Sequence, residues 1–480
     1  MSNLTDLLPA GAGGKQVRFV ASGTIGNGVT VALNSDGTVE AVSGVTAAIG
    51  SNSAFTAASE FPNYISSSYD SNANKVVVVY TNGSGHVIAI VGTVSGTTIS
   101  FGSAATAASV SSIWLSSSYD TTAQKIVISY TDTTNSYYGK AIVGTVSGTS
   151  ISFGTPVVYN SGNSYHSNNV YDPSANKTVI AYRDVSSSNQ GKAIVGTVSG
   201  TSISFGSEST FDTVFCQFPN QVYDANANKI SIVYQDANAG DGKAVVGTVS
   251  GTSISFGTPI TFTTNDLESM SGAYDSNALK VVYCYRDIGN SNFGTVAVGT
   301  ISGTSISFGT PVVFSSGGVT KTSLAYDSLA NKIVISYSDS ANSNYGTLVT
   351  GTVSGSSITF DSSIIYSSTS FYGVGTFVTY DSSSSKNIIS WATNGYQGFS
   401  AVYQSASSNS ADFIGISDAA ISDTASGSVT IKGGISTNVT GLTPNATYYV
   451  QSDGSLSTTA SDVLAGKALS STSINLDYTT

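Results

Sequence analysis

The sequence predicts an all-β protein: a seven-bladed β-propeller of four-stranded blades, with a small C-terminal β domain after it. Three observations predict this fold. A Tyr-Asp pair recurs at intervals of 50 to 54 residues, a longer segment recurs in step with it, and only 9% of the residues are charged while 40% are hydrophobic. Repeats of this length that contain four strand-like segments are typical of propeller blades.

The repeat is defined by two motifs. A Lys follows the Tyr-Asp pair each time, and this Lys accounts for seven of the 17 cationic residues. The pairs are Tyr69-Asp70, Tyr119-Asp120, Tyr171-Asp172, Tyr223-Asp224, Tyr274-Asp275, Tyr326-Asp327 and Tyr380-Asp381. The second motif resembles Val-Gly-Thr-Val-Ser-Gly-Thr-Ser-Ile-Ser-Phe-Gly and begins at Val91, Val143, Val195, Val246, Val298 and Thr350, with a degraded seventh copy from Val402 to Gly415.

Each copy is predicted to contain four strands, A to D. Strand A ends at the Tyr-Asp pair, strand B follows the Lys, strand C contains the Val-Gly-Thr-Val segment, and strand D contains Ser-Ile-Ser-Phe. The Ser-Gly between strands C and D indicates a tight hairpin, because Gly tolerates positive φ. Strand B is apolar on both faces, which predicts burial on both faces as in stacked blades. Its fifth residue after the Lys is always aromatic: Tyr80, Tyr130, Tyr182, Tyr234, Tyr285, Tyr337 and Trp391.

The alternative fold is a parallel β-helix or solenoid. Its rungs are usually shorter and lack the two tight hairpins seen in each copy, so the propeller is the preferred prediction. Cys284 lies at a small position of strand B and is expected to be a core residue. With Cys216 it forms at most one disulfide bond, which excludes a disulfide framework.

The chain is divided by these patterns into four regions. We expect an N-terminal arm at 1–16, a β-hairpin region at 17–49, the propeller at 50–411 and the C-terminal β domain at 412–480. The hairpin, which turns at Asp36-Gly37, could complete the last blade and close the ring. Alternatively, Val402 to Gly415 supplies that outer hairpin, and the N-terminal strands belong to an accessory module.

Composition argues against two classes of protein. The net charge of −11 argues against a nucleic-acid-binding protein, and no apolar run is long enough to span a membrane. The first residues lack the basic and apolar regions of a signal peptide, although the composition is that of a rigid extracellular β protein.

Both ends of the chain resemble tail and fibre-type proteins of tailed phages, particularly marine ones. The resemblance rests on "MSNLTDLLPAGAGGKQV" and "NGVTVALNSDGTVEAV" at the start, and on "GGISTNVTGLTPNATYYVQSDGSLSTT" near the end. It implies a virion protein that assembles in the host cytoplasm without a signal peptide, is oligomeric in the particle and contacts other virion proteins. No functional residue is carried over with this resemblance.

Patterns typical of catalysis or metal binding are scarce. There are two His, His86 and His166, and no nucleophile elbow, so a hydrolytic triad and a zinc site are disfavoured. The Asp-rich turn after strand A resembles the start of a calcium loop, but it lacks the Gly and the late Glu, which favours an Asx turn. We predict no metal and no cofactor.

A second acid follows strand B in five copies: Asp132, Asp184, Asp236, Asp287 and Asp339. Arg183-Asp184 and Arg286-Asp287 invite comparison with sialidases, which are propellers that bind a carboxylate with several Arg. Arg recurs at this place in only two copies, so a capping Asp is the preferred interpretation, and the sequence predicts that the protein is not an enzyme.

The predicted binding face carries the variable loops between strands B and C and between strands D and A. Its aromatic residues are the candidate ligand-binding residues: Tyr137, Tyr138, Tyr165, Phe215, Phe218, Phe293, Tyr345, Tyr372 and Tyr396. The predicted function is a non-enzymatic phage virion protein, associated with a tail or fibre, that binds a host-surface glycan or a neighbouring virion protein there. The alternatives are a capsid-decoration protein without a ligand and a carbohydrate-active, sialidase-like propeller enzyme.

Overall fold

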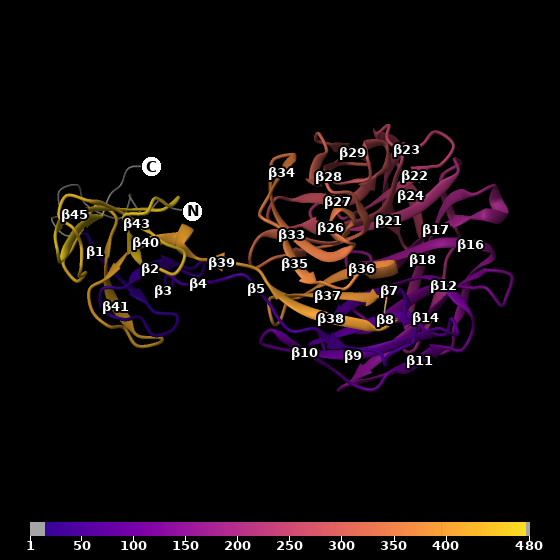
Figure 1. Ribbon diagram of the computed structural model, residues 1–480, viewed down its shortest axis with the longest axis horizontal. Helices are drawn as coiled ribbons and strands as arrows, with labels where there is room; N and C mark the ends of the chain where they lie inside the picture. Colours follow the sequence, from indigo (N-terminus) through magenta and orange to yellow (C-terminus); the bar gives the residue numbers. More distant parts are fainter. Residues whose placement is uncertain (1–14, 395, 477–480) are drawn as a thin grey trace. The chain divides into compact units, whose positions relative to one another are not determined.

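The structure is a computed structural model that describes residues 15–394 and 396–476, without the side chains of 372–374 (Figure 1). It is all-β, and its strands pair antiparallel. The chain divides into two compact units. We call residues 48–404 the repeat body and the described residues of 1–47 and 405–480 the terminal body. All but the last two residues of the predicted arm, 1–16, lie outside the described residues.

The repeat body contains the seven copies, and every copy forms an antiparallel sheet in the order A-B-C-D. The A strands are β7 (Asn63–Asp70), β12 (Ser112–Asp120), β16 (Val157–Asp172), β21 (Cys216–Asp224), β26 (Leu267–Asp275), β31 (Val319–Asp327) and β36 (Phe371–Asp381). The B strands are β8 (Lys75–Thr81), β13 (Lys125–Asp132), β17 (Lys177–Asp184), β22 (Lys229–Asp236), β27 (Lys280–Asp287), β32 (Lys332–Asp339) and β37 (Lys386–Thr393).

The outer half of each copy is equally regular. The C strands are β9 (Val87–Ser95), β14 (Tyr138–Ser147), β18 (Gln190–Ser199), β23 (Asp241–Ser250), β28 (Phe293–Ser302), β33 (Tyr345–Ser354) and β38 (Gly398–Gln404). In copies one to six, the D strands are β10 (Thr98–Phe101), β15 (Ser150–Phe153), β19 (Ser202–Phe205), β24 (Ser253–Phe256), β29 (Ser305–Phe308) and β34 (Ser357–Phe360).

Short strands continue the outer edge after strand D and pair with the start of strand C. They are β11 (Ala105–Ala108), β20 (Ser209–Asp212), β25 (Ile260–Thr263), β30 (Val312–Ser315) and β35 (Ile364–Ser367). In copy two, the first part of the long strand β16 pairs with strand C in this way. The rest of β16 is strand A of copy three, so the two copies share one nine-stranded sheet. Three B–C loops contain single 3₁₀ turns: η2 (Val185–Ser187), η3 (Ile288–Asn290) and η4 (Ser340–Asn342).

Strand B is buried on both faces, as predicted. In β8, Val77 and Val79 belong to a core cluster with copy two, while Val76 and Val78 belong to a cluster with copy seven. Burial of alternate residues on opposite sides requires a neighbouring sheet on each side. The seven aromatic residues of strand B are at most 3% exposed, and Cys284 is a buried core residue. Both cysteines are free.

The copies are arranged in a closed circle. Each A strand packs against the A strand of the next copy, and β36 of copy seven packs against β7 of copy one. At this last junction Ser67 is hydrogen-bonded to Thr379, and the cluster around Val78 includes Ile388 and Val402. The repeat body is therefore a β-propeller-like arrangement of radially placed sheets.

The last copy takes its outer strand from the N-terminal side of the repeat body. Strands β5 (Ala48–Ile49) and β6 (Ser53–Ala54) pair with β38, so the two ends of the repeat body meet in one sheet. The predicted hairpin at Asp36-Gly37 does form, as β2 (Thr30–Leu33) and β3 (Val39–Ala41), but it pairs within the terminal body. Strand β5 is the last two residues of the predicted region 17–49, so the closing strand comes from the N-terminal side, as one alternative expected, but not from the hairpin itself.

The terminal body combines both ends of the chain. Its first sheet has the order β1-β41-β40-β2-β3, so the predicted C-terminal domain shares a sheet with N-terminal strands. The remaining bounds are β1 (Gln16–Val20), β40 (Phe413–Ser417), β41 (Ser426–Ile431), and, in the second sheet, β42 (Ile435–Ser436), β43 (Thr447–Val450), β44 (Leu456–Ser457), β45 (Leu464–Ser470) and β46 (Ser473–Leu476). Strands β4 (Gly44–Val45) and β39 (Ser407–Ser408) pair with each other, and η5 (Ser410–Asp412) follows them. One core cluster joins the two sheets.

Candidate functional site

The Asp-rich turns after strand A are structural. In every copy the Asp of the Tyr-Asp pair accepts hydrogen bonds at Oδ1 from the backbone N–H groups two and three residues later, as Asp70 does from Asn72 and Ala73 at 3.0 and 2.9 Å. The same pairs recur at Asp120, Asp172, Asp224, Asp275, Asp327 and Asp381. The Asx-turn interpretation is confirmed. Within the described part of the chain, no group of three His, Cys, Asp or Glu side chains is arranged to hold a metal ion.

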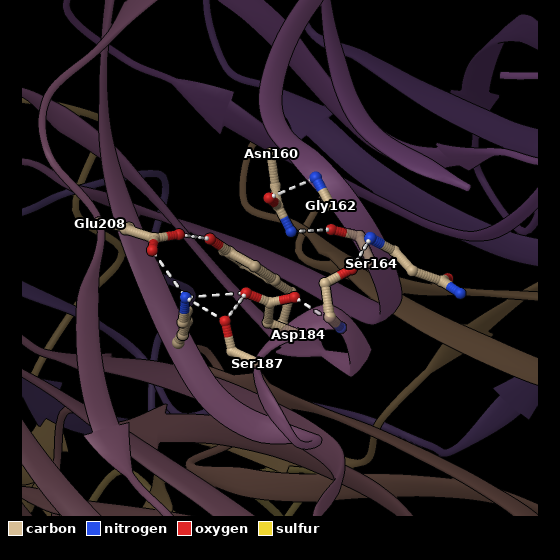
Figure 2. A network of polar contacts seen from close by, with 10 residues as sticks. Asn160, Gly162, Ser164, Asp184, Ser187 and Glu208 are labelled. Atoms are coloured by element: carbon tan, nitrogen blue, oxygen red, sulfur yellow. Dashed lines mark hydrogen bonds and ion pairs between the residues drawn. The ribbon is translucent and has the colours of Figure 1, made fainter. Parts of the chain in front are cut away.

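The second acids cap the B–C loops, which confirms the preferred interpretation. Asp184 accepts from the backbone of Ser186 at 3.0 Å and from the hydroxyl of Ser187 at 2.7 Å. Figure 2 shows that it lies in a wider network, in which the Lys192 ammonium bridges Asp184 and Glu208 at 2.7 and 2.6 Å. Copies two and four repeat the ion pair, with Lys140 on Asp132 and Lys243 on Asp236.

The network in copy three predicts an acid-sensitive step in unfolding. Burial acts to raise the pKa of Asp184, but hydrogen bonds from Lys192 and Ser187 lower it below its ordinary value. A folded-state pKa below the unfolded value of about 3.9 contributes stability above that pH, and the contribution is lost as the pH falls through the folded pKa. In Lys192→Met the burial remains without the cation, so we expect the acid-unfolding midpoint, followed by circular dichroism, to rise by about one pH unit.

Lys332→Met is the control for this prediction. Its ion pair with Asp361 is largely solvent-exposed, with 52% of the Asp361 side chain accessible, and exposed pairs contribute little to stability. The acid-unfolding midpoint of this variant should match that of the unmodified protein. Equal midpoints in all three proteins would contradict the role assigned to Lys192.

A cluster of aromatic side chains lies where the A strands begin, at the end of the sheets that carries the B–C and D–A loops. The sixth residue before the Asp of the Tyr-Asp pair stands at a β-bulge of strand A and has positive φ in six copies. The residues and their φ angles are Tyr64 (46°), Trp114 (48°), His166 (52°), Phe218 (51°), Ser269 (54°) and Gly375 (99°). Lys321 holds this place in copy six.

The side chains of four successive copies contact one another there. The Trp114 ring centroid lies 6.3 Å from that of Tyr64 and 4.6 Å from that of His166, which lies 4.5 Å from Phe218. The Tyr165 ring lies 4.2 Å from that of Trp114 and is tilted by 47° to it. All of them remain partly exposed. We call Tyr64, Trp114, Tyr137, Tyr165, His166 and Phe218 the aromatic cluster.

His166 acts in this cluster as a neutral ring. Burial, and secondarily the nearby Arg183 charge, lower the pKa of His166 to about 3. The imidazole is therefore uncharged at neutral pH and packs as a flat, partly polar side chain between Trp114 and Phe218.

Polar side chains of strand B stand beside the cluster. The sixth residue after the Lys is Arg183 in copy three, Gln235 in copy four and Arg286 in copy five. Gln235 donates to Asp266, and Arg286 pairs with Glu268. Arg183 is instead covered by two aromatic rings, Tyr165 at 4.8 Å and Phe215 at 5.3 Å.

The structure brings some of the predicted site residues together and leaves others apart. Tyr165 and Phe218 are in the cluster, Tyr137 joins it through Tyr165 at 5.6 Å, and Phe215 is linked through Arg183. Tyr396 stacks at 4.1 Å on Phe61, outside the cluster. Tyr138, Phe293 and Tyr345 are half-buried at the starts of their C strands, with no ring contact recorded to the others, and the side chain of Tyr372 lies outside the described residues.

Sequence reasoning missed Tyr64, Trp114, His166 and Arg183. A signal was present, because the first three occupy one repeat position, which aromatic residues fill in four copies in succession. That position lies inside strand A, whereas binding residues were expected in the variable loops. Only the bulge, with its positive φ, brings these side chains to the same end as the loops.

Comparison with known proteins adds little about function. No protein-family model matches the sequence, and a search of curated proteins gives no match. Among solved structures, the chain is similar to a mutant of AofleA from Arthrobotrys oligospora, at 11% identity and a TM-score of 0.42, over 69% of this chain and 94% of that one. It is also similar to the periplasmic gluconolactonase PpgL of Pseudomonas aeruginosa, at 11% identity and a TM-score of 0.48, over 74% of this chain and 97% of that one.

The second structure corrects one prediction. A gluconolactonase is an enzyme, and the prediction that the protein is not an enzyme is withdrawn. That prediction rested on the scarcity of His and Arg, which excludes particular catalytic arrangements and not catalysis in general. At 11% identity no activity is transferred from either structure to this chain. Among the described residues there is also no helix long and apolar enough to cross a membrane.

Proposed function

We infer that the seven copies are the blades of a seven-bladed β-propeller. Support comes from the circular order of the A strands, from core clusters on both faces of strand B, and from β5 and β6, which pair with copy seven. A tyrosine ladder runs in the same order. Tyr171 bonds to Thr122 of the preceding copy at 2.7 Å, and the pKa of Tyr69 in copy one is raised by burial and, to a smaller extent, by Asp381 of copy seven.

We propose that this propeller binds carbohydrate at the aromatic cluster. The single observation that carries the proposal is the run of bulky residues at positive φ. Such residues rarely adopt this conformation, which costs about 1 kcal/mol or more at each position. Ser269 and Gly375 occupy the same bulge in other copies, so the bulge itself does not require an aromatic ring.

The chemistry of the cluster fits a sugar. Partly exposed rings offer flat apolar surfaces for the C–H face of a pyranose, while the Tyr hydroxyls and the neutral His166 supply hydrogen-bonding groups at the rim. The net charge of −11 makes a nucleic acid an unfavourable ligand for stacking on the same rings.

We further propose that the protein is displayed on a phage particle, with the terminal body as its attachment module. Two of the stretches that resemble phage tail and fibre proteins, 27–42 and 433–459, are far apart in sequence, yet both contribute to the terminal body. A mass-spectrometric inventory of purified virions tests this placement. Absence of the chain from virions of a phage that encodes it would contradict the placement and leave the carbohydrate site unaffected.

Trp114→Ala tests the carbohydrate site. We expect the unmodified protein to bind members of a glycan array, and the variant to bind the same glycans at least about 30-fold more weakly, because loss of a central aromatic side chain typically costs about 2 kcal/mol or more. The thermal unfolding midpoint should change little, because Trp114 is partly exposed.

Phe61→Ala is the matched control, since Phe61 is 39% exposed and stacks on Tyr396, which is not a member of the cluster. It should bind like the unmodified protein. No binding to any glycan, or equal binding by Trp114→Ala, would overturn the proposal. Mass spectrometry of the glycans after incubation distinguishes binding alone from binding followed by hydrolysis.

A further inference from the structure

Arg183 stands out among the polar groups beside the aromatic cluster, because its charge is buried without an acidic partner. The residue is 7% exposed. Its Nε is buried and has no hydrogen-bond partner, and the contacts of its guanidinium group are the faces of Tyr165 and Phe215. Burial lowers the pKa of Arg183, which is the direction expected for a cation removed from water.

The nearby acids are already paired with lysines. Asp184, the next residue in sequence, binds Lys192, and Asp236 and Asp212 both lie within ion-pair distance of Lys243. Cys216 lies close to Arg183, but burial raises the pKa of its thiol well above the ordinary value, so it is neutral and provides no counter-charge. Among the residues that the structure describes, no acid thus compensates the charge of Arg183.

The equivalent residues of the next two copies show which kind of partner Arg183 lacks. Gln235 and Arg286 occupy the same place in strand B, and both contact a carboxylate, that of Asp266 and that of Glu268. Glu268 faces Arg286 across the β26–β27 pairing, as Tyr165 faces Arg183 across β16–β17. Where copy five supplies a carboxylate, copy three supplies an aromatic ring of the binding cluster.

We propose that Arg183 binds a carboxylate of the ligand, and hence that the carbohydrate recognised at the aromatic cluster is an acidic sugar. This proposal rests on the carbohydrate site proposed above. A buried, unpaired cation is costly, and an incoming carboxylate removes that cost while forming charge-assisted hydrogen bonds in a site of low polarity. The guanidinium carbon of Arg183 lies over the rings of Tyr165 and Phe215, and a guanidinium group offers a planar set of N–H donors that matches a carboxylate.

Paired ligands that differ only at one carbon test the proposal. Methyl glucuronide is compared with methyl glucoside, and methyl galacturonide with methyl galactoside, by calorimetry and by quenching of tryptophan fluorescence. We expect the acidic member of at least one pair to bind at least about tenfold more tightly, in line with the strength of a charge-assisted contact. Added NaCl should weaken the binding of the acidic member more than that of the neutral one.

Two variants assign the preference to Arg183. Arg183→Met keeps an unbranched side chain that packs well against aromatic rings, so it should fold, bind the neutral sugars as before and lose the preference for the acidic ones. Tyr165→Glu gives Arg183 the internal partner that Arg286 already has, and it should also lose the preference. Arg286→Met, whose parent residue is paired with Glu268, should retain it.

The outcomes separate the two proposals. Equal affinity for the acidic and neutral members of both pairs, or an undiminished preference in Arg183→Met, overturns the role of Arg183 and leaves the carbohydrate site in place. Absence of binding by every sugar and by the glycan array overturns the carbohydrate site itself, and the acidic-sugar proposal with it.

Discussion

Trp391→Ala is expected to lower the free energy of unfolding of the repeat body by about 3–5 kcal/mol, the usual range for removing a large buried aromatic side chain. Trp391 is fully buried in copy seven. Its ring lies 4.9 Å from that of Tyr366, 6.0 Å from Phe399 and 6.3 Å from Phe371. Because these neighbours belong to strands fixed by hydrogen bonds, they cannot close the cavity. Chemical denaturation with circular dichroism measures the loss.

The chain contains only two tryptophans, which makes the comparison with Trp114 direct. Trp391→Ala should lower the free energy of unfolding and leave sugar binding intact in the folded fraction. Trp114→Ala should weaken sugar binding and leave the free energy of unfolding nearly unchanged. Trp391→Phe is a milder control, since it keeps a ring and removes an indole Nε1–H that has no hydrogen-bond partner. A Trp391→Ala protein as stable as the unmodified one would mean that copy seven is not packed as described.

Gly50→Val is expected to destabilise the closed ring by about 3 kcal/mol or more, at the upper end of the cost of overpacking. A Cβ at Gly50 would lie 1.6 Å from the backbone oxygen of Thr97 in copy one. The clash is with backbone, so the closing strand itself must move, and with it the pairing of β5 with β38. We expect a lower unfolding midpoint and faster hydrogen exchange of the amides in β38.

The same close approach recurs between neighbouring copies. Gly102, Gly154, Gly206, Gly257 and Gly309 each meet the C–D turn of the next copy, at 1.8 to 2.0 Å from the added Cβ. Asp361 takes this place in copy six, because the seventh copy draws its outer strand from β5 and has no C–D turn to approach. The position is thus Gly only where a turn lies against it.

Two controls interpret the Gly50 result. Gly102→Val should cost a similar amount without freeing β38, and Ser51→Val, next to Gly50 but exposed, should change stability by no more than about 0.5 kcal/mol. If Gly50→Val were as stable as Ser51→Val, the N-terminal strand would not close the ring.

The repeating part of the fold could be predicted from the sequence because short-range interactions within each copy determine its turns and strands. The Asx turn at each Tyr-Asp pair, the Ser-Gly turn and the doubly apolar strand B act within a few residues. The roles of Asp184 and its equivalents as loop caps were predictable for the same reason. The bulge in strand A was not predicted, because Tyr64, Trp114 and Phe218 are not residue types that favour positive φ.

By itself, then, the sequence determined an all-β protein of repeated four-stranded sheets and located a face with variable, aromatic loops. Tertiary structure alone decided which strand closes the last sheet, since Ala48-Ile49 is too short to show a pattern and gains its partner only when the ends of the repeat body meet. Tertiary structure also decided which residues come together at the proposed site. Trp114, His166 and Phe218 come from three successive copies, and Arg183 lies on a different strand of copy three from His166. No local rule reveals that the three rings touch, or that Arg183 has no acid beside it among the described residues.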